Sequence, residues 1–302
     1  MRARHRPPAR PAEADAPRLI ACLCARELAG GSAVNWSYLG FWAAGGLAGL
    51  VSGVFILRAR RVLTPAAFGA LVIAWVGFAI GAKWQHRLEY LPVLTALWIS
   101  PQEIFEPGMR LPLGLVTGAV LAGLWCVLFR APWREVGDAL AVAASVLIPI
   151  GRLGCLANGC CMGGVCRRFA LFCMRFPPET EAYGAQLQHN LISPGDLLSL
   201  PAHPLPAYFA VASLLTLAVL LWLLRRGAPA GSMLATFCIL RPLTKLSLEP
   251  LRAVPRPGAL MLGIPATVLL VTCTVLGVMF VRRAAARTER RARLGPKEAA
   301  ST

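Results

Sequence analysis

Residues 36–57 read WSYLGFWAAGGLAGLVSGVFIL, a run of 22 residues without a charged side chain. A helix needs about 20 apolar residues to cross the hydrocarbon core of a bilayer, so we predict a transmembrane helix here. Six further stretches are predicted to cross the membrane: residues 65–83, 111–129, 137–157, 204–224, 231–250 and 258–281. The fold class that follows is an all-α polytopic membrane protein of about seven transmembrane helices.

The composition favours the same fold class. Of the 302 residues, 57% are hydrophobic and 15% are charged, and the mean hydropathy is +0.61. A soluble domain of this size has more surface than so few polar residues can cover, so lipid must form part of the solvent. The net charge of +17 does not indicate nucleic acid, because the basic residues fall in tails and short connections without a nucleic-acid-binding motif. Anionic membrane lipids are the expected partner of this charge.

Three regions follow from the distribution of apolar and charged residues. Residues 1–34 are expected to form a disordered basic tail rather than a signal peptide, because their apolar core, 19–25, is too short. Residues 35–282 form the predicted membrane domain, whose longest connection is the outer loop 158–203. Residues 283–302 are predicted to form a basic cytoplasmic tail.

Arginine-rich connections predict the orientation, because short loops of this kind stay in the cytoplasm. They follow the first, third and fifth spans and contain Arg58, Arg60, Arg61, Arg130, Arg134, Arg225 and Arg226. Seven spans then place the N-terminus outside and the C-terminus in the cytoplasm. Residues 91–100 are apolar but too short to cross, and are expected to lie in the interface or to re-enter the membrane.

Glycines recur four residues apart in three of the predicted spans. They are Gly45, Gly49 and Gly53, then Gly77 and Gly81, then Gly114 and Gly118. Small residues at this spacing let helix backbones approach closely in lipid. We interpret them as a packing signal with no chemistry attached.

Arg152 lies at the end of the fourth span, in the sequence Gly151-Arg152-Leu153-Gly154. An arginine within the membrane costs about 2.5–3.5 kcal/mol on insertion scales, and such residues usually serve a function. The flanking glycines would let a ligand or another backbone come close to the guanidinium. The alternative is that Arg152 snorkels to the outer interface.

The sixth span carries a second group of charges. They recur at helical spacing and would share one face of a continuous helix: Arg241, Lys245, Glu249 and Arg252. Such a face must look onto other helices or water rather than lipid. Together with Arg152 it predicts a lipid-accessible cationic cavity, and phosphate suits the forked donors of arginine. The alternative is a structural ladder of ion pairs.

His203-Pro204 opens the fifth span, and Tyr208 follows about one turn later. A histidine at a helix mouth is more often a cap or an interface residue than a base. The position of His203 near the predicted outer rim nevertheless makes it a candidate.

Half of the ten cysteines fall within one short segment: Cys155, Cys160, Cys161, Cys166 and Cys173. Their spacing is not C-x2-C, so we predict no metal site. In an extracytoplasmic loop, disulfides are expected among Cys160, Cys161, Cys166 and Cys173, with the connectivity left open. A redox role has little support, because nothing nearby in the sequence marks a thiolate of lowered pKa.

Three blocks, taken in order, resemble the prolipoprotein diacylglyceryl transferase family. They are Gly151-Arg152-Leu153-Gly154 with Asn158, His203-Pro204 with Tyr208, and Glu249 with Arg252. The resemblance covers about residues 108–252 and implies a seven-helix protein of the bacterial cytoplasmic (inner) membrane with its N-terminus outside. It further implies transfer of a diacylglyceryl group from phosphatidylglycerol to the lipobox cysteine thiol of a prolipoprotein, or a related transfer to another acceptor.

The resemblance also implies roles for individual residues. Arg152 would clamp the phosphate leaving group and stabilise its developing charge, and Asn158 would hydrogen-bond the head group. Further head-group contacts are expected from Gly151, Gly154, Tyr208, Arg241, Lys245 and Arg252. His203 and Glu249 are the candidate proton acceptors, so the expected catalytic set is Arg152, His203 and Glu249, with no cofactor.

The chain departs from the family pattern at candidate catalytic positions. Cys155 and Cys160 stand where the family has an asparagine and an acidic residue, and Pro112 replaces a histidine. The other departures are Pro206 for a glutamine, Phe209 for a glutamate, Lys245 for an arginine and Arg241 for a tyrosine. Two alternatives therefore stay open: a non-catalytic phospholipid-binding membrane protein, and a thiol-disulfide membrane protein.

Overall fold

The computed structural model describes residues 36–90, 111–166, 173–178 and 180–252. The described helices are α2 (Trp36–Ala59), α3 (Pro65–Tyr90), α5 (Leu111–Leu128), α6 (Trp133–Ala157), α7 (Glu181–Gln188), α8 (Leu205–Arg225), α9 (Ser232–Leu248) and the one-turn η2 (Glu249–Leu251). The predicted seventh span, the two tails and residues 91–100 lie outside the described residues.

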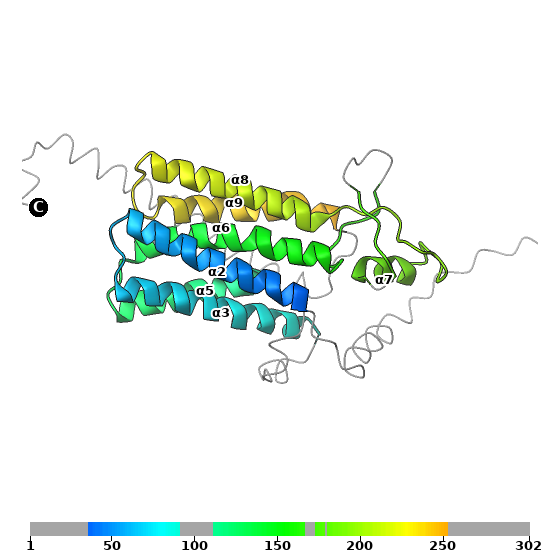
Figure 1. Ribbon diagram of the computed structural model, residues 1–302, viewed down its shortest axis with the longest axis horizontal. Coiled ribbons are helices and arrows are strands. Elements are labelled where there is room, and N and C mark those ends of the chain that lie inside the picture. Colours follow the sequence, from blue (N-terminus) through cyan, green and yellow to red (C-terminus); the bar gives the residue numbers. More distant parts are fainter. Residues whose placement is uncertain (1–35, 91–110, 167–172, 179, 253–302) are drawn as a thin grey trace, which may run out of the picture.

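The six long helices run side by side, and short α7 lies beyond one end of the bundle (Figure 1). Within the described residues, five helices are long and apolar enough to cross a membrane: α2, α3, α5, α6 and α8. Helix α9 covers the sixth predicted span with 17 residues. The chain is therefore an all-α polytopic membrane protein, as the sequence predicted.

Helix α6 is the centre of the bundle, because it contacts α2, α3, α5, α8 and α9. Glycines at four-residue intervals bring α2 onto it. A Cβ atom on Gly45 would lie 3.0 Å from the carbonyl oxygen of Leu147, and one on Gly49 would lie 2.9 Å from that of Ala143. Backbone oxygens cannot move aside cheaply, so these glycines set the distance between the two helices.

A second glycine contact joins α3 to α5. A Cβ atom on Gly114 would lie 2.8 Å from the carbonyl oxygen of Phe78, and one on Gly118 would lie 2.6 Å from that of Ala74. Both glycine patterns therefore serve helix packing, which confirms the interpretation drawn from their spacing.

The C-terminal part of α3 extends further than predicted. The predicted span ended at residue 83, yet α3 continues to Tyr90. Lys83 and Gln85 are buried there. The Gln85 side-chain oxygen accepts a hydrogen bond from the backbone N–H of Leu113 at 2.9 Å, so this polar stretch caps the start of α5.

A buried ion pair holds the opposite end of the bundle together. Asp138 on α6 is fully buried and accepts hydrogen bonds from the backbone N–H groups of Gly231 and Leu234, at 2.9 and 3.0 Å. Arg60 lies 3.4 Å from Asp138 and donates to the carbonyl oxygen of Ala228 at 2.7 Å. The carboxylate therefore caps the start of α9 and ties it to the turn after α2. The arginine-rich connections share this end of the bundle (Figure 1).

Candidate functional site

Two arginines from different helices meet at one aromatic ring. The Arg152 guanidinium carbon, from α6, lies 4.9 Å from the centroid of the Phe209 ring on α8. The Arg241 guanidinium carbon, from α9, lies 5.6 Å from the same centroid. The electron-rich ring face attracts both cations and gathers them in one place. Because two like charges held this close repel each other, the arrangement favours an anion beside them.

Each of the two arginines has a buried side-chain N–H donor without a hydrogen-bond partner among the described residues. The two donor atoms are Arg152 Nε and Arg241 Nη1. A buried donor left unpaired costs about 1–3 kcal/mol, and more when it is charged. An anionic ligand with several oxygen acceptors would remove this cost, and phosphate is such a ligand.

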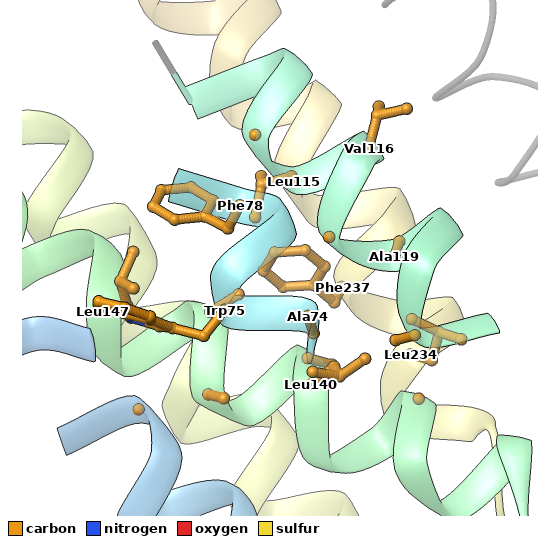
Figure 2. A pocket seen from close by; sticks show the side chains of 18 of the residues that line it. Ala74, Trp75, Phe78, Leu115, Val116, Ala119, Leu140, Leu147, Leu234 and Phe237 are labelled. Carbon is orange, nitrogen blue, oxygen red and sulfur yellow. The ribbon is translucent and has the colours of Figure 1, made fainter. Parts of the chain in front are cut away.

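An apolar cavity of about 410 Å³ opens beside Arg241. Helices α2, α3, α5, α6 and α9 line it, and Figure 2 shows the side chains of Phe78, Leu115 and Phe237 gathered around it. Arg241 and Lys245 are the charged residues among the described residues that line it. The volume falls within the roughly 300–1,000 Å³ of ordinary ligand sites. An apolar pocket whose lining also includes two cationic side chains fits an amphiphilic molecule with an anionic head group.

The predicted charged face of the sixth span is only partly present. Arg241 and Lys245 line the cavity, but helix α9 ends at Leu248. Glu249 lies in η2, where its carboxylate accepts a hydrogen bond from Arg252 Nε at 2.9 Å and is 39% exposed. The prediction of one continuous helix carrying all four charges is therefore wrong at its end. Pro250 explains the break, because it lacks the N–H that would continue the helix.

The three sequence blocks come together at the end of the bundle away from the basic connections. Gly163 donates a backbone hydrogen bond to the His203 carbonyl oxygen at 2.8 Å, and His203 donates to Gly164 at 3.1 Å. Gly164 in turn donates to Leu251 at 2.8 Å, and Gly163 pairs with Arg252 in a β-bridge. The loop after α6 thus lies between the segment before α8 and the segment after α9. Blocks far apart in the sequence share one site region.

His203 and Tyr208 form a pair within this region. The His203 Nδ1 atom lies 3.3 Å from the Tyr208 hydroxyl oxygen. A His203 ring nitrogen also lies within 4.8 Å of the sulfur atoms of Cys166 and Cys173. The structure therefore brings His203 to Tyr208.

The two glycines of the first block have a structural explanation. A Cβ atom on Gly151 would lie 2.9 Å from the ring of Trp42, and one on Gly154 would lie 2.8 Å from Cβ of Phe41. Because these two positions lack a side chain, the aromatic side chains of Trp42 and Phe41 on α2 can pack directly against the backbone of α6. Asn158 follows α6 as its C-cap residue, and its backbone N–H donates to the carbonyl oxygen of Gly154.

The cysteines divide into two groups. Cys166 and Cys173 form a disulfide, which is one of the pairings expected. Cys160 and Cys161 form no disulfide with each other or with that pair. They lie instead beside Cys155, and the three sulfur atoms are within 4.8 Å of one another.

A tight turn assembles the second group, and sequence spacing alone did not reveal it. Gly159 has a φ of +63° and donates to the carbonyl oxygen of Leu156 at 3.1 Å, while Cys160 donates to that of Cys155 at 3.0 Å. This pair of bonds is a Schellman motif, which folds the chain back over the last turn of the helix. The sequence did contain one indication of this turn: Gly159 lies four residues after Cys155 and directly before Cys160 and Cys161, where a helix-ending glycine would be expected.

The Cys160 thiol is not set up as a nucleophile. Hydrogen bonds with the thiols of Cys155 and Cys161, together with burial, raise its pKa above the usual value. A raised pKa keeps the thiol protonated near neutral pH, and the thiolate is the reactive form. This counts against a thiol-disulfide function.

Comparison with known proteins identifies the family of the chain. The profile of a family described as prolipoprotein diacylglyceryl transferase matches residues 27–283. A phosphatidylglycerol–prolipoprotein diacylglyceryl transferase of Rhodopirellula baltica is 32% identical over 135 residues, which are 43% of this chain and 26% of the relative. An enzyme of the same name from Clostridium tetani is 22% identical over 211 residues, 69% of this chain and 77% of the relative. One from Dehalococcoides mccartyi is 31% identical over 139 residues, 44% of this chain and 51% of the relative. The chain thus matches about a quarter of the first relative's length and about half of the third's.

Proposed function

Because this chain belongs to the prolipoprotein diacylglyceryl transferase family, we propose that it transfers a diacylglyceryl group from phosphatidylglycerol to a cysteine thiol of a prolipoprotein. One observation carries the proposal. Arg152 and Arg241 converge on the ring of Phe209 with buried donors unfilled, and Arg241 also lines an apolar cavity whose lining does not include Arg152. A phospholipid offers a phosphate for the first feature and acyl chains for the second.

The arginines bind the phosphate in this mechanism. Their forked donors match phosphate oxygens, and the surrounding low dielectric strengthens the attraction. Lys245 lines the same cavity and adds a third positive charge near the head group. The acyl chains then lie among the apolar side chains that Figure 2 shows.

The transfer itself exchanges one bond for another. The thiol sulfur attacks the glyceryl carbon of the lipid, a carbon–sulfur bond forms, and the bond from that carbon to the phosphate oxygen breaks. Glycerol phosphate leaves with the electron pair, and the arginines stabilise the charge that develops on it. The thiol proton needs an acceptor. His203 is favoured over Glu249, because Glu249 is engaged with Arg252.

The orientation fits this chemistry. The arginine-rich end of the bundle would face the cytoplasm of a bacterial inner membrane, by the positive-inside rule. The three sequence blocks lie at the other end and would face outward, where a secreted precursor presents its cysteine. The N-terminus would then lie outside, as predicted.

A second candidate function is phospholipid binding without transfer. Pro112 favours it, because this residue lines the cavity where the family has a histidine. Proline has no side-chain group that could accept a proton.

Product mass separates the two functions. We would express the protein with a lipobox substrate in a host depleted of its own transferase, and determine the mass of the substrate by mass spectrometry. Transfer predicts a thioether-linked diacylglyceryl adduct whose yield falls about 100-fold with Arg152→Ala, the scale of losing a charge-stabilising group. Arg225→Ala, at an exposed arginine of the basic end, should leave the yield unchanged. Phosphatidylglycerol binding without an adduct would establish the second function instead.

A further inference from the structure

The thiols of Cys155, Cys160 and Cys161 form a compact cluster at the end of α6. The three sulfur atoms lie within 4.8 Å of one another; Cys155 is buried and the other two are half-buried. The Schellman turn at Gly159 holds them together through the backbone. Three thiols on one side of a rigid turn are a set of soft metal ligands.

The distances suit a zinc ion. Zn²⁺ binds thiolate sulfur at about 2.3 Å, so the sulfurs of a tetrahedral site lie roughly 3.8 Å apart. The sulfur atoms already lie within 4.8 Å of one another, so they need to close by no more than about 1 Å to reach this geometry. Rotation about the Cα–Cβ bonds is enough for such a change, so the backbone turn can stay as it is.

The surroundings also suit a zinc–trithiolate group, which carries a net negative charge. Cys155, Cys160 and Cys161 pack against the core cluster that contains Tyr38 and Trp42, which shields them from water. Three thiolates and one Zn²⁺ carry a net charge of −1. Arg152 lies one helical turn before Cys155 on α6, so its positive charge is close enough to compensate.

We propose that Cys155, Cys160 and Cys161 bind one Zn²⁺ ion and leave its fourth position open for the acceptor thiol. Three protein ligands with an open fourth position are the pattern of reactive zinc sites, whereas structural sites are closed. A thiol bound to zinc is deprotonated outright, so the ion would supply the activation that a histidine at the position of Pro112 would otherwise give.

The role of the fourth position rests on the proposed function. Zinc binding displaces the three cysteine protons, and the incoming acceptor thiol loses a fourth proton to water or His203. Its sulfur then forms the bond to the glyceryl carbon, glycerol phosphate leaves with the electron pair, and the thioether leaves the metal. No electrons are exchanged with an outside partner.

Metal content of the purified full-length chain tests the site directly. We would purify the detergent-solubilised protein without reductant, which keeps the Cys166–Cys173 disulfide intact, strip it with a chelator, and titrate it with Zn²⁺ alone and with Co²⁺ alone. The expected result is one ion per chain, with the intense sulfur-to-cobalt absorption of a thiolate site. Cys155→Ser, Cys160→Ser and Cys161→Ser should each lower the affinity at least 10-fold, whereas Cys126→Ala, at a free cysteine on α5, should not.

The wild-type protein supplies a readout that needs no variant. Zn²⁺ should protect Cys160 and Cys161 from alkylation, measured residue by residue by mass spectrometry. Alkylation at the same rate with and without Zn²⁺ would overturn the site. So would a disulfide joining any two of the three cysteines in protein purified without reductant.

The transfer assay tests the role of the fourth position separately. Chelation should lower the adduct yield, and added Zn²⁺ should restore it. An undiminished yield after chelation would refute metal activation and leave the proposed transferase function standing. No adduct with or without Zn²⁺ would remove both the transferase function and the activation step, while stoichiometric Zn²⁺ binding would still establish the site.

Discussion

At the scale of single residues, the account depends on where a few charges and thiols lie. Arg152 and Arg241 were both predicted from the cost of burying arginine, and the structure brings them to one ring. Phe209 as their common platform was not predicted, because nothing in a sequence shows that helices α6, α8 and α9 meet at this position. The cysteine cluster escaped prediction for the same kind of reason, since it depends on the left-handed backbone of Gly159 and of Cys161 itself.

The shape of the Arg152 side chain should matter as well as its charge. Arg152→Lys keeps the charge but loses the planar fork, so a single point contact replaces two parallel bonds to phosphate. We expect phosphatidylglycerol binding to weaken roughly 10-fold, which corresponds to about 1.4 kcal/mol. Lipid titration of the purified protein measures the phosphatidylglycerol affinity. An affinity equal to that of the wild type would show that Arg152 does not bind the phosphate through two parallel hydrogen bonds.

Phe209 should contribute through its ring rather than its size. Phe209→Leu keeps an apolar side chain but removes two cation–π contacts, each worth about 0.5–2 kcal/mol. Phosphatidylglycerol affinity should fall several-fold, and the thermal stability should fall as well, because both contacts exist in the protein without lipid and Phe209 is buried. Phe129→Leu, at an exposed ring stacked on Trp125, is the control and should leave the affinity unchanged.

At the scale of helices, hydropathy located the elements well and their ends less well. Six predicted spans are helices in the structure, and the glycine spacing identified the faces of α2, α3 and α5 that pack. The end of α3 was placed too early because charged residues usually mark a membrane boundary, whereas Lys83 and Gln85 are buried. The polar residues of α3 and α6 have tertiary partners that hydropathy cannot register.

The contact between α2 and α6 should not tolerate a methyl group. Gly49→Ala would place its Cβ atom 2.9 Å from the carbonyl oxygen of Ala143. Overpacking of this kind costs about 1–3 kcal/mol, so the melting temperature in detergent should fall by several degrees. Gly40→Ala meets nothing within 4 Å and should be neutral. Equal melting temperatures for the two variants would contradict the packing described.

The buried carboxylate of Asp138 should be needed for stability. Asp138→Ala leaves Arg60 and two backbone N–H groups at the start of α9 without their partner. Breaking a buried pair in this way costs about 3–5 kcal/mol. The unfolding midpoint in denaturing detergent should fall strongly, and Glu135→Gln, one turn earlier on α6, should have little effect.

At the scale of the whole molecule, charge predicted that the arginine-rich connections share one side of the membrane domain, and they do share one end of the bundle (Figure 1). The arginine-rich turns all lie at one end, and the three sequence blocks lie at the other (Figure 1). The sequence predicted a cationic cavity formed by Arg152 and the sixth span, whereas the cavity found is mainly apolar and has Arg241 and Lys245 in its lining but not Arg152. Its position depends on which helices are neighbours, and that information lies in tertiary contacts rather than in any one segment.

Reporter fusions test the orientation. Green fluorescent protein fused after Gly227, in the turn that follows α8, should fluoresce because this end is predicted to lie in the cytoplasm. Alkaline phosphatase fused after Asn190, beyond α7, should be active because that end is predicted to lie outside. The reverse pattern would place the three sequence blocks on the cytoplasmic side.

The central claim is that guanidinium groups from α6 and α9 together hold an anionic lipid head. Native mass spectrometry of the purified chain with phosphatidylglycerol, and with zwitterionic phosphatidylethanolamine for comparison, tests it most directly. We predict a clear preference for phosphatidylglycerol that falls at least 10-fold in the double variant Arg152→Ala, Arg241→Ala and persists in Arg225→Ala. A double variant that retains the full preference for phosphatidylglycerol would contradict the account.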